Sequence, residues 1–74
     1  MTTPSDRLMA LRAATGLSET GFAHYLGVPI HTLKKWLSGQ RMPTSAALRL
    51  IEVLEVLQAI APGIVQHLIP QGIE

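Results

Sequence analysis

The sequence predicts an all-α fold: a compact single domain, residues 1–74, built from five helices. The chain is short and contains no cysteine, so its stability has to come from apolar packing rather than from disulfides or a cysteine zinc site. Glycine and proline divide it into short segments in which apolar residues recur at helical spacing. No segment shows the sustained alternation of polar and apolar residues that is typical of a half-buried strand.

The first helix is expected to start after Thr3 and to end near Gly16. Thr3 suits the N-cap, Pro4 suits the first helical position, and Asp6 completes a capping box. Glycine after the last helical turn is a common C-terminal signal. These residues predict both ends of the helix.

The second and third helices are separated by a short turn. Ser18 is expected to cap the second helix, and Gly27 to end it in a left-handed backbone conformation. Val28 leads into a third helix that ends at Gly39. Pro29 stands where a capping Ser or Thr is common, so we expect the third helix to lack a side-chain cap.

The fourth helix is expected to start at Pro43-Thr44 and to run to about Ile60; Pro62 opens a short fifth helix that Pro70 closes. The polar residues of the fourth helix recur every three positions and predict a narrow solvent-facing stripe: Arg49, Glu52, Glu55 and Gln58. A helix that is apolar over most of its circumference has to be covered on more than one side.

Charge is distributed unevenly along the chain. Residues 1–43 carry five basic and two acidic side chains, a net charge of +3, whereas residues 44–74 carry one arginine and three glutamates, a net charge of −2. This asymmetry indicates that the first half faces a polyanion and that the second half has another role. We expect a cytoplasmic protein, because the start lacks a signal-peptide pattern and no apolar run is long enough to cross a membrane.

Residues 19–38 contain the most informative pattern, which reads ETGFAHYLGVPIHTLKKWLS. Ala23 falls where two short helices have to approach closely, and Gly27 falls in the turn between them. The positions that would close a core beneath the pair are all apolar: Phe22, Leu26, Val28, Leu33 and Trp36.

Residues 36–43 continue this pattern as WLSGQRMP, which is similar to the W-E-x-G-x-x-x-P exit of a known motif. Together the two segments resemble the helix-turn-helix of lambda-repressor and Cro-like regulators, the XRE family. The resemblance covers about residues 4–57, and the small size is similar to that of phage or mobile-element regulators.

The resemblance implies that the third helix, residues 30–37, is a recognition helix that enters the major groove of double-stranded DNA. The base contacts it implies are Ile30, His31, Lys34 and Lys35. Lysine can donate to guanine, histidine can contact guanine or adenine according to its tautomer, and isoleucine can press on a thymine methyl.

The same resemblance implies phosphate contacts on either side of the recognition helix. These contacts are Ser18 and Thr20 at the start of the second helix, Thr32, and Gln40 and Arg41 after the third helix. A helix N-terminus offers backbone N–H groups and a favourable dipole to a phosphate.

Two departures from the family pattern affect these contacts. Glu19 stands where a neutral glutamine is common, and a carboxylate there would repel phosphate unless it turns away. Leu37 replaces a glutamate that often pairs with a basic residue of the first helix, so Arg12 lacks its expected partner.

Residues 44–70 are expected to complete the core and to form a homodimer interface, because they hold more apolar surface than so short a chain can bury. The predicted interface residues are Leu50, Val53, Leu54, Leu57, Ile60, Ile64 and Leu68. The alternative is a monomer in which the fifth helix folds back and covers this surface.

The resulting functional prediction is a homodimeric repressor that binds a palindromic operator and represses the operon containing its own gene. An alternative is an antitoxin-like or accessory protein whose C-terminal apolar face binds a different protein. An enzyme is disfavoured, because the acidic residues offer no paired acid–base site. We expect no cofactor and no metal, since no two of His24, His31 and His67 share a helical turn. RNA binding is disfavoured, because the three aromatic residues are committed to the motif.

Overall fold

The computed structural model describes residues 2–68, and every regular element among them is a helix. The elements are α1 (Pro4–Thr15), α2 (Glu19–Leu26), α3 (Ile30–Ser38), α4 (Ser45–Ile60) and α5 (Pro62–Leu68). The predicted all-α class with five helices is therefore confirmed.

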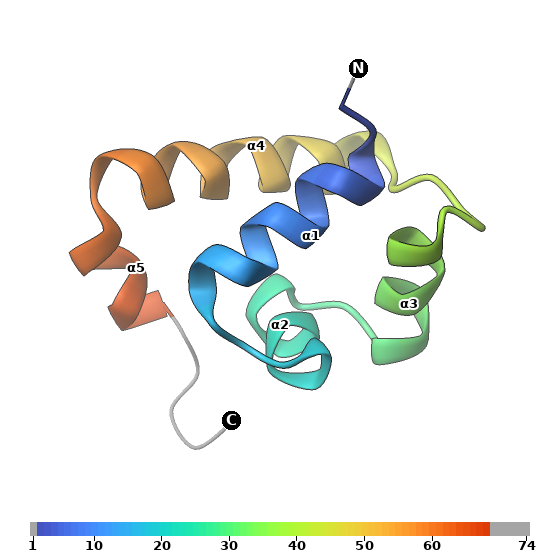
Figure 1. Cartoon of the computed structure of the whole chain (residues 1–74), viewed down its shortest axis with the longest axis horizontal. Coiled ribbons are helices and arrows are strands. Elements are labelled where there is room, and N and C mark those ends of the chain that lie inside the picture. The colour runs from blue at the N-terminus through green and yellow to red at the C-terminus, as the bar shows by residue number, and fades with distance from the viewer. Residues whose placement is uncertain (1, 69–74) are drawn as a thin grey trace.

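Helix α1 occupies the middle of the molecule (Figure 1). It packs against α4 on one side and against α2 and α3 on the other, while α5 folds back from the end of α4. The helix-turn-helix pair α2–α3 therefore lies on the far side of α1 from α4.

The ends of α1 follow the sequence prediction. The Asp6 amide donates to the Thr3 hydroxyl at 3.1 Å, and the Thr3 amide donates to the Asp6 carboxylate at 3.3 Å, so the capping box is complete. Gly16 ends the helix with a φ of 74°, a left-handed conformation that is accessible to glycine at little cost. Both predicted ends of α1 are therefore confirmed.

The turn between α2 and α3 is confirmed as well. The Ser18 hydroxyl accepts a hydrogen bond from the Gly21 amide at 3.1 Å and so caps α2. Gly27 has a φ of 78°, and the amides of Gly27 and Val28 both donate to the Ala23 carbonyl. Pro29 caps α3 without a side-chain hydrogen bond, as expected.

The fourth helix begins behind Thr44, whose hydroxyl accepts a hydrogen bond from the Ala47 amide at 3.2 Å. It ends at Ile60, as predicted, and Pro62 starts α5. The predicted closing residue Pro70, like the neighbouring Ile69, lies outside the described residues.

One core joins α1, α2, α3 and α4. Its buried members are Leu8, Leu11, Leu17, Phe22, Ala23, Leu26, Leu33, Trp36, Ile51 and Leu54. Val65 of α5 is also buried, at 1% exposure. Leu54, at 6% exposure, was expected in a dimer interface and instead belongs to this core, because its side of α4 faces the rest of the chain.

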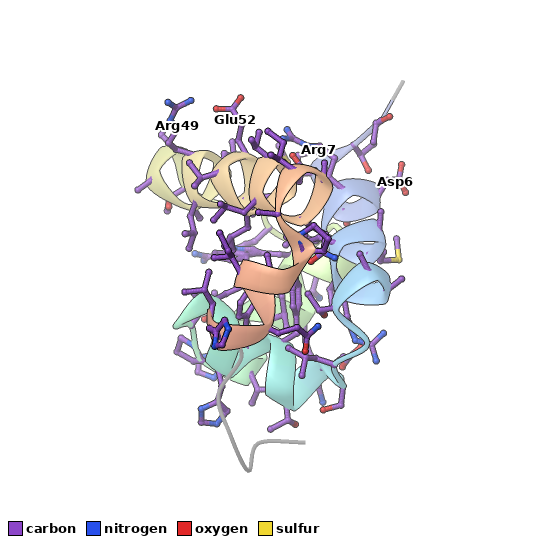
Figure 2. All side chains as sticks on the ribbon, turned by 90° about the vertical axis from the view of Figure 1, so that its left-hand side faces the viewer. Asp6, Arg7, Arg49 and Glu52 are labelled. Atoms are coloured by element: carbon purple, nitrogen blue, oxygen red, sulfur yellow. The ribbon has the colours of Figure 1, made fainter. Side chains whose placement is uncertain are left out.

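The solvent-facing stripe predicted for α4 is partly wrong. Glu55 forms an ion pair with Arg7 of α1, and the Gln58 Oε1 atom is buried, so both residues lie on the packed side of α4. Arg49 and Glu52 do point outward from α4 (Figure 2). The remaining surface of α4 is apolar, with Leu50, Val53, Val56 and Ile60 exposed. Sequence periodicity alone does not reveal the inward orientation of Glu55, because a glutamate can face inward when a distant arginine pairs with it.

Candidate nucleic-acid interface

Helix α3 has one buried face and one exposed face. Leu33 and Trp36 are buried in the core and hold the helix against the domain. His31, Lys34 and Lys35 are exposed, and their spacing of three and four residues places them side by side on one face. Three of the four predicted base contacts are therefore brought together on a single solvent-facing surface.

The other two predicted contacts on α3 are less accessible. Ile30 is half-buried and packs against the core, so only part of its side chain is open to a ligand. Thr32 is also half-buried. Both residues flank the exposed face formed by His31, Lys34 and Lys35.

The exit from α3 brings Arg41 back to the helix. Gly39 ends the helix with a φ of 80°, and the Arg41 amide then donates to the Lys35 carbonyl at 3.3 Å. The Ser38 hydroxyl donates to the same carbonyl and accepts from the Gln40 amide. Gln40 and Arg41 are exposed, so two predicted phosphate contacts are anchored directly beside Lys35.

The start of α2 provides the remaining predicted phosphate contacts. Thr20 is exposed, and Ser18 is half-buried with its hydroxyl oxygen capping the helix. Glu19 lies between them in the first turn of α2, where its negative charge interacts favourably with the positive end of the helix dipole. A carboxylate in this place is electrostatically unfavourable to a phosphate at the same helix end.

The basic residues of α1 contribute differently. Arg7 donates to Glu55 of α4, and this hydrogen bond, with the attraction of the carboxylate, raises the pKa of Arg7. Arg12 is half-buried, and its Nε atom has no hydrogen-bond partner among the described residues. Leu37 stands where the family resemblance implies a glutamate. It is also half-buried and packs against the core.

A residue that sequence reasoning missed connects α1 to α3. The Ser5 hydroxyl lies 2.6 Å from the Trp36 carbonyl oxygen and 2.9 Å from that of Leu37. No local sequence signal predicts it, because Ser5 is more than thirty residues away from both acceptors.

Comparison with known proteins identifies the architecture. The chain is 32% identical over 65 residues to YiaG of Escherichia coli, described as an uncharacterized HTH-type transcriptional regulator, and the same match occurs in three strains. The aligned region spans 88% of this chain and 68% of YiaG. The chain belongs to the family of HTH-type transcriptional regulators. No family model and no solved structure matches it significantly.

Two further properties of this regulator concern the described part of the chain. Within residues 2–68, no three His, Asp or Glu side chains are grouped so that they could hold a metal ion. None of the helices described there has the length and apolar character to cross a membrane.

Proposed function

We propose that the regulator is a homodimeric repressor that inserts α3 into the major groove of a palindromic operator. The observation that carries this proposal is the single exposed face formed by His31, Lys34 and Lys35, with Arg41 attached beside it. These side chains have the donors that base edges and phosphates accept. These side chains are exposed and take no part in the core, whereas the opposite face of α3 is buried.

The roles follow from exposure and chemistry. Lys34 and Lys35 donate to guanine O6 and N7, and His31 contacts guanine or adenine. Ile30 touches a thymine methyl with the exposed part of its side chain. Thr32 and the start of α2, with Ser18 and Thr20, position the phosphate backbone on one side, and Gln40 and Arg41 position it on the other.

The homodimer is supported by the outer surface of α4 and α5. Leu50, Val53, Leu57 and Ile60 are spaced by three, four and three residues, which is the spacing of a helix–helix seam. Three of them are exposed, whereas Leu57 is half-buried and also packs against the core. Ile60 is 78% exposed, and Ile64 and Leu68 of α5 are about half exposed. A contiguous apolar surface on a short chain is typical of an interaction site.

Val56 extends this surface beyond the residues predicted from sequence. Together with Val53, Leu57, Arg49 and Glu52 it lines a groove on α4. We propose that the groove and the seam are covered by the same elements of a second copy. Within this patch, Arg49 and Glu52 of the same chain form an ion pair. Because an isologous contact uses one patch twice, each copy offers its partner both signs of charge.

In a two-fold dimer, the two α3 helices are related by symmetry and can bind the same duplex. Two recognition helices read half-sites about 34 Å apart in adjacent major grooves. The bound dimer then blocks polymerase by occupying the promoter. We propose the regulator's own operon as the target.

The experiment is selection of bound duplexes from a random library at a fixed salt concentration, because DNA affinity depends steeply on salt. We expect enrichment of a palindrome with half-sites one helical turn apart. Enrichment of a single asymmetric half-site would contradict the dimer, and no enrichment at all would contradict sequence-specific binding.

Sedimentation of the free protein is the companion measurement. We expect a dimer at tens of micromolar. A monomer at that concentration would overturn the homodimer and leave the apolar face to a different protein, as in an antitoxin-like regulator.

A further inference from the structure

We propose that Ser5 is a positioning residue: its hydroxyl holds the C-terminal end of α3 at the orientation in which the exposed face reads bases. This inference rests on the proposed DNA-reading role of α3. It adds to that role a residue that lies outside the helix-turn-helix and that touches no DNA.

The geometry is a hydrogen bond from one helix start to another helix end. Ser5 is the second residue of α1, and its Oγ atom lies 2.6 Å from the Trp36 carbonyl oxygen and 2.9 Å from the Leu37 carbonyl oxygen. Both carbonyls belong to the last turn of α3, where carbonyl groups lack intrahelical partners. The Trp36 carbonyl also accepts the Gly39 amide at 3.3 Å, and the Ser5 hydroxyl gives the end of α3 a further donor that is shared between the two carbonyls.

Helix electrostatics add to this contact. The N-terminus of α1 carries partial positive charge and the C-terminus of α3 carries partial negative charge, and Ser5 brings these two ends together. At the other end of α3, the N-cap residue Pro29 forms no side-chain hydrogen bond. Among the side-chain hydrogen bonds between described residues, those of Ser5 are the ones that join α3 to another helix.

The anchored end of α3 lies directly beside two of the three residues of its exposed face, Lys34 and Lys35. Trp36 and Leu37 directly follow Lys34 and Lys35, and the Arg41 amide is bonded to the Lys35 carbonyl. A small rotation of this end would move both lysines and Arg41 together. Base recognition tolerates such displacements poorly, since a functional group has to lie within about 0.5 Å of its productive position.

A matched control separates positioning from stability. Glu55 of α4 accepts hydrogen bonds from Arg7 in an ion pair, which is another contact between α1 and a neighbouring helix. Replacing Glu55 by Gln weakens that contact and leaves α3 untouched. Ser5→Thr keeps the hydroxyl and provides a conservative rescue.

The experiment compares the wild type with Ser5→Ala, Ser5→Thr and Glu55→Gln at a temperature at which all are folded. The readout is the ratio of Kd for a scrambled duplex to Kd for the duplex enriched from the random library. We expect Ser5→Ala to lower this ratio about three- to tenfold, the effect of one hydrogen bond, with Ser5→Thr and Glu55→Gln close to wild type. An unchanged ratio in Ser5→Ala, or an equal loss in Glu55→Gln, overturns the proposal.

Amide hydrogen exchange in the free protein tests the anchor without DNA. We expect Ser5→Ala to accelerate exchange in the last turn of α3, and Glu55→Gln to leave that turn unchanged. A wild type without sequence preference would refute the proposed function, whereas unchanged exchange in Ser5→Ala would refute the anchor. The two failures are thus distinguished.

Discussion

Arg7 of α1 and Glu55 of α4 form a two-bonded ion pair, with Nη2–Oε1 and Nε–Oε2 distances of 2.6 and 3.2 Å. About a third of each side chain is exposed, so the pair is a modest contributor to stability. The pair also marks the side of α4 that faces α1. Because Glu55 faces α1, Val53 and Val56 face solvent, and Figure 2 shows Arg7 on the same side of the molecule as the outward-pointing Arg49 and Glu52.

A charge on the apolar surface of α4 should dissociate the proposed dimer. Val53 is 42% exposed in the single chain, so Val53→Glu is expected to leave the monomer folded and to place an unpaired carboxylate in the interface, where it costs several kcal/mol. Sedimentation equilibrium and circular dichroism measure the two effects. Ala59→Glu is the control, since Ala59 is exposed on α4 outside the 50–53–57–60 seam. A dimer that persists in Val53→Glu would place the interface elsewhere.

Removal of a reading side chain should reduce sequence discrimination more than it reduces general DNA binding. Lys35→Ala and His31→Ala are each expected to lose about 1–3 kcal/mol of discrimination between the selected duplex and a single-base variant. Both side chains are exposed, so melting temperatures should remain near that of the wild type. Ala59→Glu, which lowers the net charge by the same one unit at an exposed position outside the seam, serves as the control for net charge. Equal losses on every duplex would reassign Lys35 to a phosphate.

Arg41 should behave as a phosphate contact. Arg41→Ala keeps the backbone hydrogen bond to Lys35 and removes one cation beside the DNA backbone. We expect weaker binding to all sequences and a salt dependence that is flatter by about one unit of slope in log Kd against log salt. Titrations at several salt concentrations measure the slope. A slope identical to that of the wild type would exclude a phosphate role for Arg41.

The Tyr25 hydroxyl is buried without a hydrogen-bond partner among the described residues, while its ring stacks on Phe22 with centroids 6.2 Å apart. Tyr25→Phe should therefore equal or exceed the wild type in stability at pH 7, by at most about 1 kcal/mol. Thermal unfolding measures the difference. A clear loss of stability would mean that the hydroxyl has a partner, such as a bound water.

Burial also raises the pKa of Tyr25, which predicts a pH dependence. The folded state disfavours the phenolate, so stability is unaffected below the unfolded pKa of about 10 and falls as the pH rises from there toward the folded value. Tyr25→Phe should remove this part of the alkaline loss. Melting temperatures of both proteins between pH 8 and pH 11 provide the test, and parallel curves would contradict it.

The parts of the fold that were predictable from the sequence are those determined by local chemistry. Thr3, Ser18 and Thr44 cap helices through groups three residues away, and Gly27 and Gly39 end helices in a conformation that suits glycine. Such signals act within one turn of the chain. They are readable without knowing how the helices pack.

The parts that escaped prediction depend on distant segments. The inward orientation of Glu55 requires Arg7, which lies 48 positions away, and the Ser5 contact requires the end of α3. Hydrophobic periodicity likewise could not separate Leu54 in the core from Val53 on the surface, because α4 is apolar on both sides. At the candidate site, the exposed face of α3 was predictable, since its offsets from Trp36 determine which residues face outward.

The exposed face of α3 has a consequence for how such a protein can change. His31, Lys34 and Lys35 contribute nothing to the buried core, which Leu33 and Trp36 supply from the opposite side of the same helix. Substitutions at these three positions can therefore accumulate without eroding foldability. Under the proposed function, new operator preferences are accessible to drift or to laboratory redesign by exchanging three side chains on an otherwise constant scaffold.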